Sequence, residues 1–265
     1  MAKNEFMKRA LIIIALLLGG CLSAFGQEFE RKVFTAEDGT QLNYRLLRPS
    51  ETAKAKKFPL IIFLHGLGER GTDNESQLKW GGQMFLNPAT QEKFPAYVLF
   101  PQCPETAFWA YKNIPASFTD MKEEEVMPAP FKAVKEMIDT YLNYPDVDRS
   151  RVYIIGLSMG GMATYDMVSR FPEIFAAAIP ICGAVDPTRL ADIEGVSFRI
   201  FHGDADTVVP VECSRKAYKA LREAGVEVAY IEFPGCTHGS WNPAFNRDDF
   251  MEWLFKQKKS RKYLK

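Results

Sequence analysis

Residues 152–163 read VYIIGLSMGGMA, and this stretch decides how the rest of the sequence is interpreted. The apolar run at 152–155 predicts a strand, and the residues from Met159 onward predict a helix. Ser158 stands between them, with a glycine two residues away on each side. The glycines allow a sharp strand-to-helix turn, which would lift the serine hydroxyl above the edge of a sheet. We therefore predict that Ser158 is a nucleophile; a serine that only caps the helix is the alternative.

Further short apolar runs lie on both sides of this turn, and most of them lack the alternation of a strand with one solvated face. Such runs are typical of a parallel sheet that is covered on both faces. Helical patterns separate several of them, so we expect strands and helices to alternate in a wound sheet. Two strands around the turn at residues 38–39 do alternate, which predicts one solvated face there. The apolar runs are at residues 60–64, 97–100, 176–181, 198–201 and 228–231.

The length and composition of the chain fit one folded domain over residues 27–265. The chain has 265 residues, of which 47% are hydrophobic, so it can bury a large core. Lysine plus arginine and aspartate plus glutamate number 33 each. This balance does not favour a nucleic-acid partner, which would select a basic surface. The sequence leaves the oligomeric state open.

The N-terminus has the three-part pattern of a secretory signal peptide over residues 1–26. Basic residues precede an apolar run at 11–18, and small residues follow it. The run is too short to remain as a bilayer-spanning anchor. Cleavage before Gln27 would release a periplasmic or secreted protein. Residues 18–21 also resemble a lipobox, in which case Cys21 would be lipidated and would hold the protein at a membrane. We expect export by either route.

Export would make disulfides chemically possible for the four cysteines that remain. The sequence does not choose among the possible pairings, and free buried thiols are the alternative. The spacings do not match a zinc ribbon or a redox CxxC motif. The four residues are Cys103, Cys182, Cys213 and Cys236.

A serine nucleophile needs a base, and the chain has only three histidines. His65 and His202 each end an apolar run and precede a glycine, whereas His238 lies in a loop after the last predicted strand. Such a loop can bring an imidazole to the serine. The order serine, acid, histidine along the chain also favours His238. A histidine exposed on a surface loop is the alternative for His238.

The base in turn needs an acid, which orients the ring and stabilises its protonated form. Asp206 follows the penultimate predicted strand and is the preferred candidate. Asp204 is two residues away and is the first alternative, although an aspartate there also suits a turn. Asp186, which follows the strand ending near Cys182, is the second alternative.

Two backbone N–H groups are predicted to bind the oxyanion that forms during acyl transfer. Met159 follows the nucleophile, and Leu67 lies in the His-Gly-Leu-Gly turn after the first parallel strand. A plain glycine turn is the alternative at Leu67. Around the cleft, the rings of Trp109 and Trp241 and the amide of Gln102 are predicted substrate contacts, with interior packing as the alternative for the rings.

These motifs resemble the bacterial esterase and "predicted peptidase" branch of the α/β-hydrolases, which is related to feruloyl and acetylxylan esterases, polyhydroxybutyrate depolymerases and dienelactone hydrolases. The resemblance implies the α/β-hydrolase fold, a mostly parallel twisted sheet with helices on both faces. It also implies Ser158, Asp206 and His238 as the catalytic triad, and a C-terminal helix around Trp253. Leu67 departs from the family, where a smaller residue is common, but a backbone donor survives that change. The matching segments are LHGLGERG at 64–71, FPQCPE at 100–105, GLSMGGMATYD at 156–166, FPEIFAAAIPICG at 171–183, HGDADTVVPV at 202–211 and PGCTHGSW at 234–241.

The sequence as a whole predicts an exported serine hydrolase that cleaves carboxylic esters through an acyl-enzyme. Acyl esters of carbohydrates are the preferred substrates, so the expected partner is a small-molecule or oligosaccharide ester, and the mechanism needs no metal or organic cofactor. A serine peptidase with the same triad is the first alternative. Two alternatives come from other classes: a metal hydrolase built on the three histidines, which lack short ligand spacing, and a non-catalytic glycan-binding protein on a hydrolase scaffold.

The connection lengths predict an open cleft. Only about 15 residues separate the strand that ends near Cys182 from the strand that begins near Phe198, too few for an inserted lid domain. The longer stretches at 66–96 and 102–130 are therefore expected to bound the cleft above Ser158.

Overall fold

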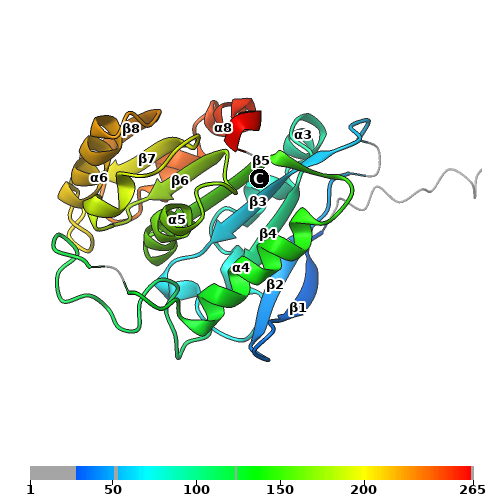
Figure 1. Cartoon of the computed structure of the whole chain (residues 1–265), viewed down its shortest axis with the longest axis horizontal. Coiled ribbons are helices and arrows are strands. Elements are labelled where there is room, and N and C mark those ends of the chain that lie inside the picture. Colours follow the sequence, from blue (N-terminus) through cyan, green and yellow to red (C-terminus); the bar gives the residue numbers. More distant parts are fainter. Residues whose placement is uncertain (1–27, 51–52, 123, 264–265) are drawn as a thin grey trace, which may run out of the picture.

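The computed structural model describes residues 28–50, 53–122 and 124–263 (Figure 1). The predicted signal segment, both of its cleavage sites and Cys21 therefore lie outside the described residues. Over the described ranges, no helix combines the length and the apolar character that crossing a bilayer would require.

One eight-stranded sheet runs through the described chain in the order β1-β2-β4-β3-β5-β6-β7-β8 (Figure 1). Strand β2 pairs antiparallel with both β1 and β4, whereas every later pair of neighbours is parallel. The mostly parallel sheet predicted from the apolar runs is thus confirmed. The strands are β1 (Glu30–Thr35), β2 (Gln41–Leu47), β3 (Phe58–Leu64), β4 (Tyr97–Pro101), β5 (Val147–Leu157), β6 (Ala177–Ile181), β7 (Ser197–Gly203) and β8 (Val228–Phe233).

Helices cover both faces of this sheet, and the central strands show why their sequences lack alternation. Along β3, Leu60 and Ile62 point into one apolar layer, and Ile61 and Phe63 point into the other. All seven residues of β3 are buried as a result. One layer packs under α4 (Ala129–Leu142), α5 (Met159–Arg170) and α6 (Glu212–Glu223). The other packs under α2 (Gly82–Leu86), α7 (Trp241–Phe245) and α8 (Phe250–Lys256), with α3 (Pro88–Lys93) following α2.

The edge strand β1 is different, because partly buried and exposed residues alternate along it. Its neighbour β2 also alternates over most of its length, with Leu42, Tyr44 and Leu46 buried. The N-terminal pair therefore has one solvated face, as the sequence predicted.

The carboxyl edge of the parallel strands carries loops of unequal length. Between β6 and β7 there is only one short 3-10 helix, η3 (Pro187–Leu190). The stretch between β3 and β4 is longer and holds η1 (Leu67–Glu69), η2 (Ser76–Leu78), α2 and α3. This distribution leaves the edge to be shaped by the stretches after β3 and β4, rather than by an insertion after β6.

Candidate active site

Ser158 lies in a strained turn between β5 and α5. Its backbone has φ 54° and ψ −117°, a conformation that is costly for a residue with a side chain. The neighbouring elements enforce it, because β5 ends at Leu157, α5 begins at Met159, and the Ser158 amide donates to the Ile181 carbonyl at 2.9 Å. The sharp turn predicted from the sequence is therefore present.

The two glycines of the Gly-x-Ser-x-Gly pattern allow this turn to pack. A Cβ atom on Gly156 would lie 2.1 Å from the Gly160 carbonyl oxygen, and one on Gly160 would lie 1.9 Å from the Leu64 carbonyl oxygen. Any larger residue would push α5 away from β5 and β3. Glycine is therefore required at both positions for a steric reason: the helix approaches the sheet closely beneath the serine.

Three side chains from separate loops meet at the edge of the sheet. The Nε2 atom of His238 lies 2.9 Å from Ser158 Oγ, and its Nδ1 atom lies 2.7 Å from Asp206 Oδ2. With Nδ1 donating to the carboxylate, Nε2 is free to accept the serine proton. These are the distances at which a general base can act on a hydroxyl. The structure therefore brings together the three residues that the sequence predicted as nucleophile, acid and base.

Asp206 is held as an ionised carboxylate. Its Oδ1 accepts the amides of Val208 and Val209 at 2.8 and 3.0 Å, and its Oδ2 lies 3.2 Å from His202 Nε2 in addition to His238. Burial by itself would raise the pKa of Asp206, but the hydrogen bonds from His202, His238 and the Val209 amide outweigh it and hold the pKa well below its usual range. Asp206 can therefore balance a positive charge on His238.

His202 supports Asp206 and is not a second base. Its Nε2 lies 2.9 Å from the Val209 carbonyl oxygen, which can only accept, so Nε2 carries a hydrogen. Its Nδ1 then accepts from the Ser214 hydroxyl at 2.7 Å. The sequence did not predict this contact between His202 and Asp206; the four-residue spacing after a strand end was its only signal.

The two alternative acids have other partners. Asp204 is exposed, and its Oδ1 accepts the Gly235 amide at 2.6 Å, which holds the loop that carries His238. Asp186 accepts the amide and the hydroxyl of Thr188 at the start of η3 and forms an ion pair with Lys122 at 3.2 Å. Neither carboxylate contacts His238, so the structure selects Asp206 among the three candidates.

His65 has a structural position beneath the turn that follows β3. Its Nδ1 donates to the Gly66 carbonyl at 2.6 Å, and its Nε2 accepts the Cys103 amide at 3.0 Å. Burial lowers the pKa of His65 to about 4, because the charged form would lose its hydration. Since His65 and His202 use both ring nitrogens in these bonds, the three histidines do not offer nitrogens to one common metal ion.

Among the described residues, one other group of ligand-type atoms lies close enough together to suggest a metal site. A nitrogen of His238, a carboxylate oxygen of Asp206 and the sulfur of Cys182 lie within 4.8 Å of one another. The first two are already bonded to each other. Burial and the nearby Asp206 carboxylate raise the pKa of the Cys182 thiol, which opposes the thiolate that a metal would need. The group therefore fits an acid–base pair beside a neutral thiol better than a metal centre.

The two predicted oxyanion donors stand at the starts of helices on either side of the serine. Leu67 is the first residue of η1, and Met159 is the first residue of α5. The N–H groups of a first helical turn have no partner within the helix, so both are available to an anion. Both residues also line the same cavity as Ser158.

That cavity has a volume of about 200 Å³ and opens beside the serine hydroxyl. Its walls are almost entirely apolar and carry no charged side chain. Several of the wall residues come from the stretch 102–130, which the sequence predicted to bound the cleft without identifying them. Besides Leu67, Ser158 and Met159, the lining residues are Phe108, Tyr111, Ile114, Pro115, Phe118, Met162, Val208 and Val209.

Comparison with known proteins places this geometry in a family. Residues 50–248 match the family described as Phospholipase/Carboxylesterase. The chain belongs to this family. A protein named "Probable carboxylesterase SOBER1-like" from Arabidopsis thaliana is 27% identical over 194 residues, which are 69% of this chain and 73% of the plant protein. The protein "Feruloyl esterase B" from Neurospora crassa is 29% identical over 129 residues, which are 49% of this chain and 40% of that protein.

A solved structure supports the same assignment. The "Crystal Structure of a Thermostable Esterase" superposes with a TM-score of 0.79 at 38% identity and covers 87% of this chain. The chain spans 63% of that esterase's length. Together the matches confirm the α/β-hydrolase fold and a hydrolase of the carboxylesterase type.

The structure corrects two predicted substrate contacts of this hydrolase. Trp109 is 0% exposed, and its Nε1 donates to the His65 carbonyl at 3.2 Å. Gln102 is 1% exposed and holds the loop after η1, with its Nε2 2.7 Å from Asp73 Oδ1 and its Oε1 accepting the Asn74 amide at 2.7 Å. Both side chains brace the loops around the turn at Leu67 from inside, where a substrate cannot reach them.

Trp241, the third predicted contact, does lie beside the triad. It is partly exposed, and its ring centroid is 5.5 Å from that of His238, with the two rings almost perpendicular. On its other side, Trp80 lies at a centroid distance of 5.5 Å. Trp80 was not predicted from the sequence, because nothing local marks it as a neighbour of residue 241.

The four cysteines in the described residues are all free thiols. Cys103, Cys182 and Cys213 are buried, and Cys236 is partly exposed. Of the possibilities left open by the sequence, the structure thus has unpaired thiols rather than disulfides.

Proposed function

We propose that this hydrolase cleaves carboxylic esters with Ser158, His238 and Asp206 as a catalytic triad. The observation that carries the proposal is the hydrogen-bonded chain from Ser158 Oγ through His238 to Asp206, presented on a strained turn. A glycan-binding protein would have no need for this strain, which costs stability. The non-catalytic alternative is therefore disfavoured.

The mechanism follows from the positions of these atoms. Ser158 Oγ attacks the ester carbonyl while His238 Nε2 takes its proton, and Asp206 balances the charge on the ring. The amides of Leu67 and Met159 bind the resulting oxyanion. His238 then gives the proton to the alcohol oxygen, which leaves, and an acyl-enzyme remains. A water molecule, deprotonated by His238, attacks the acyl-enzyme, and His238 gives that proton to Ser158 Oγ as the bond to the serine breaks and the carboxylic acid leaves.

The apolar cavity beside Ser158 supports the proposal that the acyl group of the substrate is uncharged and of limited size. A carboxylate in such a cavity would lose its hydration without gaining a hydrogen-bond or ionic partner, which is costly.

We propose acyl esters of carbohydrates as the substrates. The match to a protein named feruloyl esterase B supports this choice, as does the short connection between β6 and β7, which leaves room for a large alcohol.

A panel of esters tests the proposal. We expect p-nitrophenyl acetate and butyrate to be hydrolysed, and the matching hemisuccinate to have a kcat/KM at least about tenfold lower because of the desolvated charge. Peptide p-nitroanilides should be poorer than the neutral esters. Triglyceride emulsions should give no jump in rate at the solubility limit, because the described connection between β6 and β7 holds no inserted lid domain that would have to open. Hydrolysis of the hemisuccinate as fast as of the butyrate would contradict the acyl site, and faster cleavage of the anilides would favour the peptidase alternative.

We also propose that the protein is exported, on the basis of the signal-like pattern of residues 1–26. Mass spectrometry of the protein isolated from its native host is expected to show a terminus at Gln27 or a lipidated Cys21. Solubility of the native protein without detergent would distinguish the first form from the second. An intact Met1 on the active protein would contradict export by either route.

A further inference from the structure

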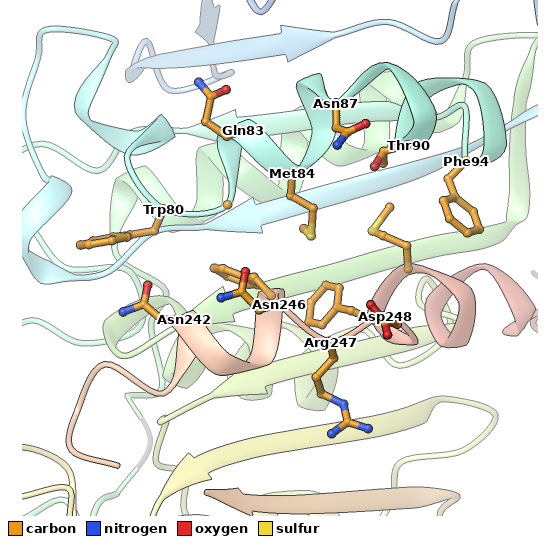
Figure 2. Close-up of a pocket in the computed structure, with 14 residues that line it drawn as sticks. Trp80, Gln83, Met84, Asn87, Thr90, Phe94, Asn242, Asn246, Arg247 and Asp248 are labelled. Atoms are coloured by element: carbon orange, nitrogen blue, oxygen red, sulfur yellow. The ribbon is translucent and has the colours of Figure 1, made fainter.

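A second and larger hollow lies on the opposite face of the sheet from the acyl cavity. It has a volume of about 570 Å³ and runs between α2 and α3 on one side and α7 and the start of α8 on the other (Figure 2). We call it the amide groove, after the side chains of Gln83, Asn87, Asn242 and Asn246 that line it. Figure 2 shows Asn242 across the groove from Trp80. The proposed mechanism makes no use of this groove.

Two aromatic side chains, Trp80 and Trp241, link the amide groove to the base of the triad. Trp80 and Asn242 line one end of it. Trp80 contacts the ring of Trp241, and Trp241 contacts the ring of His238, each at a centroid distance of 5.5 Å. The groove is therefore connected to His238 by two ring contacts.

The chemistry of ester cleavage assigns the two hollows to the two halves of a substrate. With the acyl group in the apolar cavity beside Ser158, the alcohol oxygen must face His238 Nε2, because His238 returns the proton to it. The rest of the alcohol then leaves the triad past His238. Trp241 and the amide groove are the surface that it meets there.

The lining of the amide groove fits a neutral ligand rich in hydroxyl groups. In the described part of the chain, the amides of Gln83, Asn242 and Asn246 have no protein hydrogen-bond partner, so each offers both donors and an acceptor. Arg247 forms an ion pair with Asp249 at 2.9 Å, and Asp249 also pairs with Arg199. With the carboxylate of Asp248, the charges at this side of the groove sum to zero and favour neither an anion nor a cation.

Aromatic surface is available in the groove as well. Trp80 and Phe94 lie toward its two ends in Figure 2 and offer apolar faces to the C–H groups of a sugar. The ammonium of Lys79 is 5.1 Å from the Trp80 ring centroid, but this side chain is exposed and can move away at a cost of about 1 kcal/mol or less.

We infer that the amide groove is the subsite for the alcohol part of the substrate and that it binds a neutral oligosaccharide. The inference rests on the proposed esterase function and adds to it where the leaving alcohol sits and which groups hold it. Hydrogen bonds from Asn242 and Asn246 hold the sugar hydroxyls, with Trp80 and Trp241 forming the path from the groove to the serine.

Two measurements test the groove, with the double substitution Asn242→Ala/Asn246→Ala as the variant. The first is binding of xylotetraose and cellotetraose to the Ser158→Ala protein by calorimetry, with and without the double substitution. The second is the ratio of kcat/KM for acetylated xylotetraose to that for p-nitrophenyl acetate. We expect the double substitution to weaken tetrasaccharide binding and to lower the ratio, each by about tenfold, because two neutral hydrogen bonds are lost.

A control variant and the contrary outcomes distinguish a failure of the groove inference from a failure of the proposed esterase function. Asn143→Ala removes an exposed amide at the end of α4, on the other face of the sheet, and should change neither quantity. If the enzyme hydrolyses p-nitrophenyl acetate but binds neither tetrasaccharide, or if the double substitution changes neither quantity, the subsite is overturned and the esterase function stands. Inhibition by a neutral peptide that competes at the groove, without binding of either sugar, would also overturn it. If no ester is hydrolysed at all, the proposed function itself fails.

Discussion

Replacing Ser158 with alanine is expected to lower kcat for p-nitrophenyl acetate by at least about 10⁴-fold, and this is the largest single effect that we predict. The hydroxyl is the atom that forms the acyl-enzyme, and no other side chain is bonded to His238 Nε2 in the described residues. Hydrolysis that remains would come from water activated by His238 in the intact oxyanion site. Steady-state rates with the purified variant measure the loss.

The fold of the Ser158→Ala variant should be unchanged, because alanine has the same Cβ and meets the same strained backbone. Thermal unfolding followed by circular dichroism should therefore give a midpoint close to that of the unmodified protein. Ser169→Ala is the matched control, since Ser169 lies in the same helix and its hydroxyl only donates to the Tyr165 carbonyl at 2.9 Å. Activity of Ser158→Ala near that of this control would exclude Ser158 as the nucleophile.

The second largest effect is expected when Asp206 becomes asparagine. An asparagine can donate its NH₂ to His238 Nδ1, which moves the ring hydrogen to Nε2 and removes the acceptor for the serine proton. In serine hydrolases with this arrangement the loss is about 10⁴-fold in kcat. The Oδ1 contacts to the Val208 and Val209 amides can persist in the variant, so the protein should still fold.

Asp204→Asn is the comparison that makes the Asp206 result specific. Asp204 Oδ1 accepts the Gly235 amide, and an asparagine oxygen can still accept it. We expect less than about a tenfold loss for this variant, since a neutral acceptor weakens the bond without removing it. A greater loss for Asp204→Asn than for Asp206→Asn would transfer the acid role to Asp204.

The fold and the nucleophile could be predicted because their signals are local or repeated. The pattern around Ser158 depends on steric contacts of Gly156 and Gly160 with atoms of the same turn and the strands beside it, so the sequence records it directly. Apolar runs without alternation follow from burial on two faces, which all seven residues of β3 show. Each of these patterns can be recognised in the sequence without knowing which strands are neighbours in the sheet.

The roles of the side chains around the nucleophile depended on contacts between distant segments. Asp204 and Asp206 look alike in sequence, and the turn after β7 alone directs Asp206 to His238 and Asp204 to Gly235. Trp109 and Gln102 follow a strand end, as cleft residues do, yet the packing of two loops buries them.

By itself, then, the sequence determined the mostly parallel sheet, the sharp turn at Ser158 and the chain order of the three triad residues. Only the tertiary structure decided which aspartate meets His238, which aromatic rings remain accessible, and that residues 80–94 and 241–251 come together as a groove two ring contacts from the base. The physical reason is the separation along the chain over which each interaction acts. Backbone sterics and strand burial act within a few residues and leave a pattern in the sequence, whereas the walls of a cavity are set by packing between segments that have no local sign of each other.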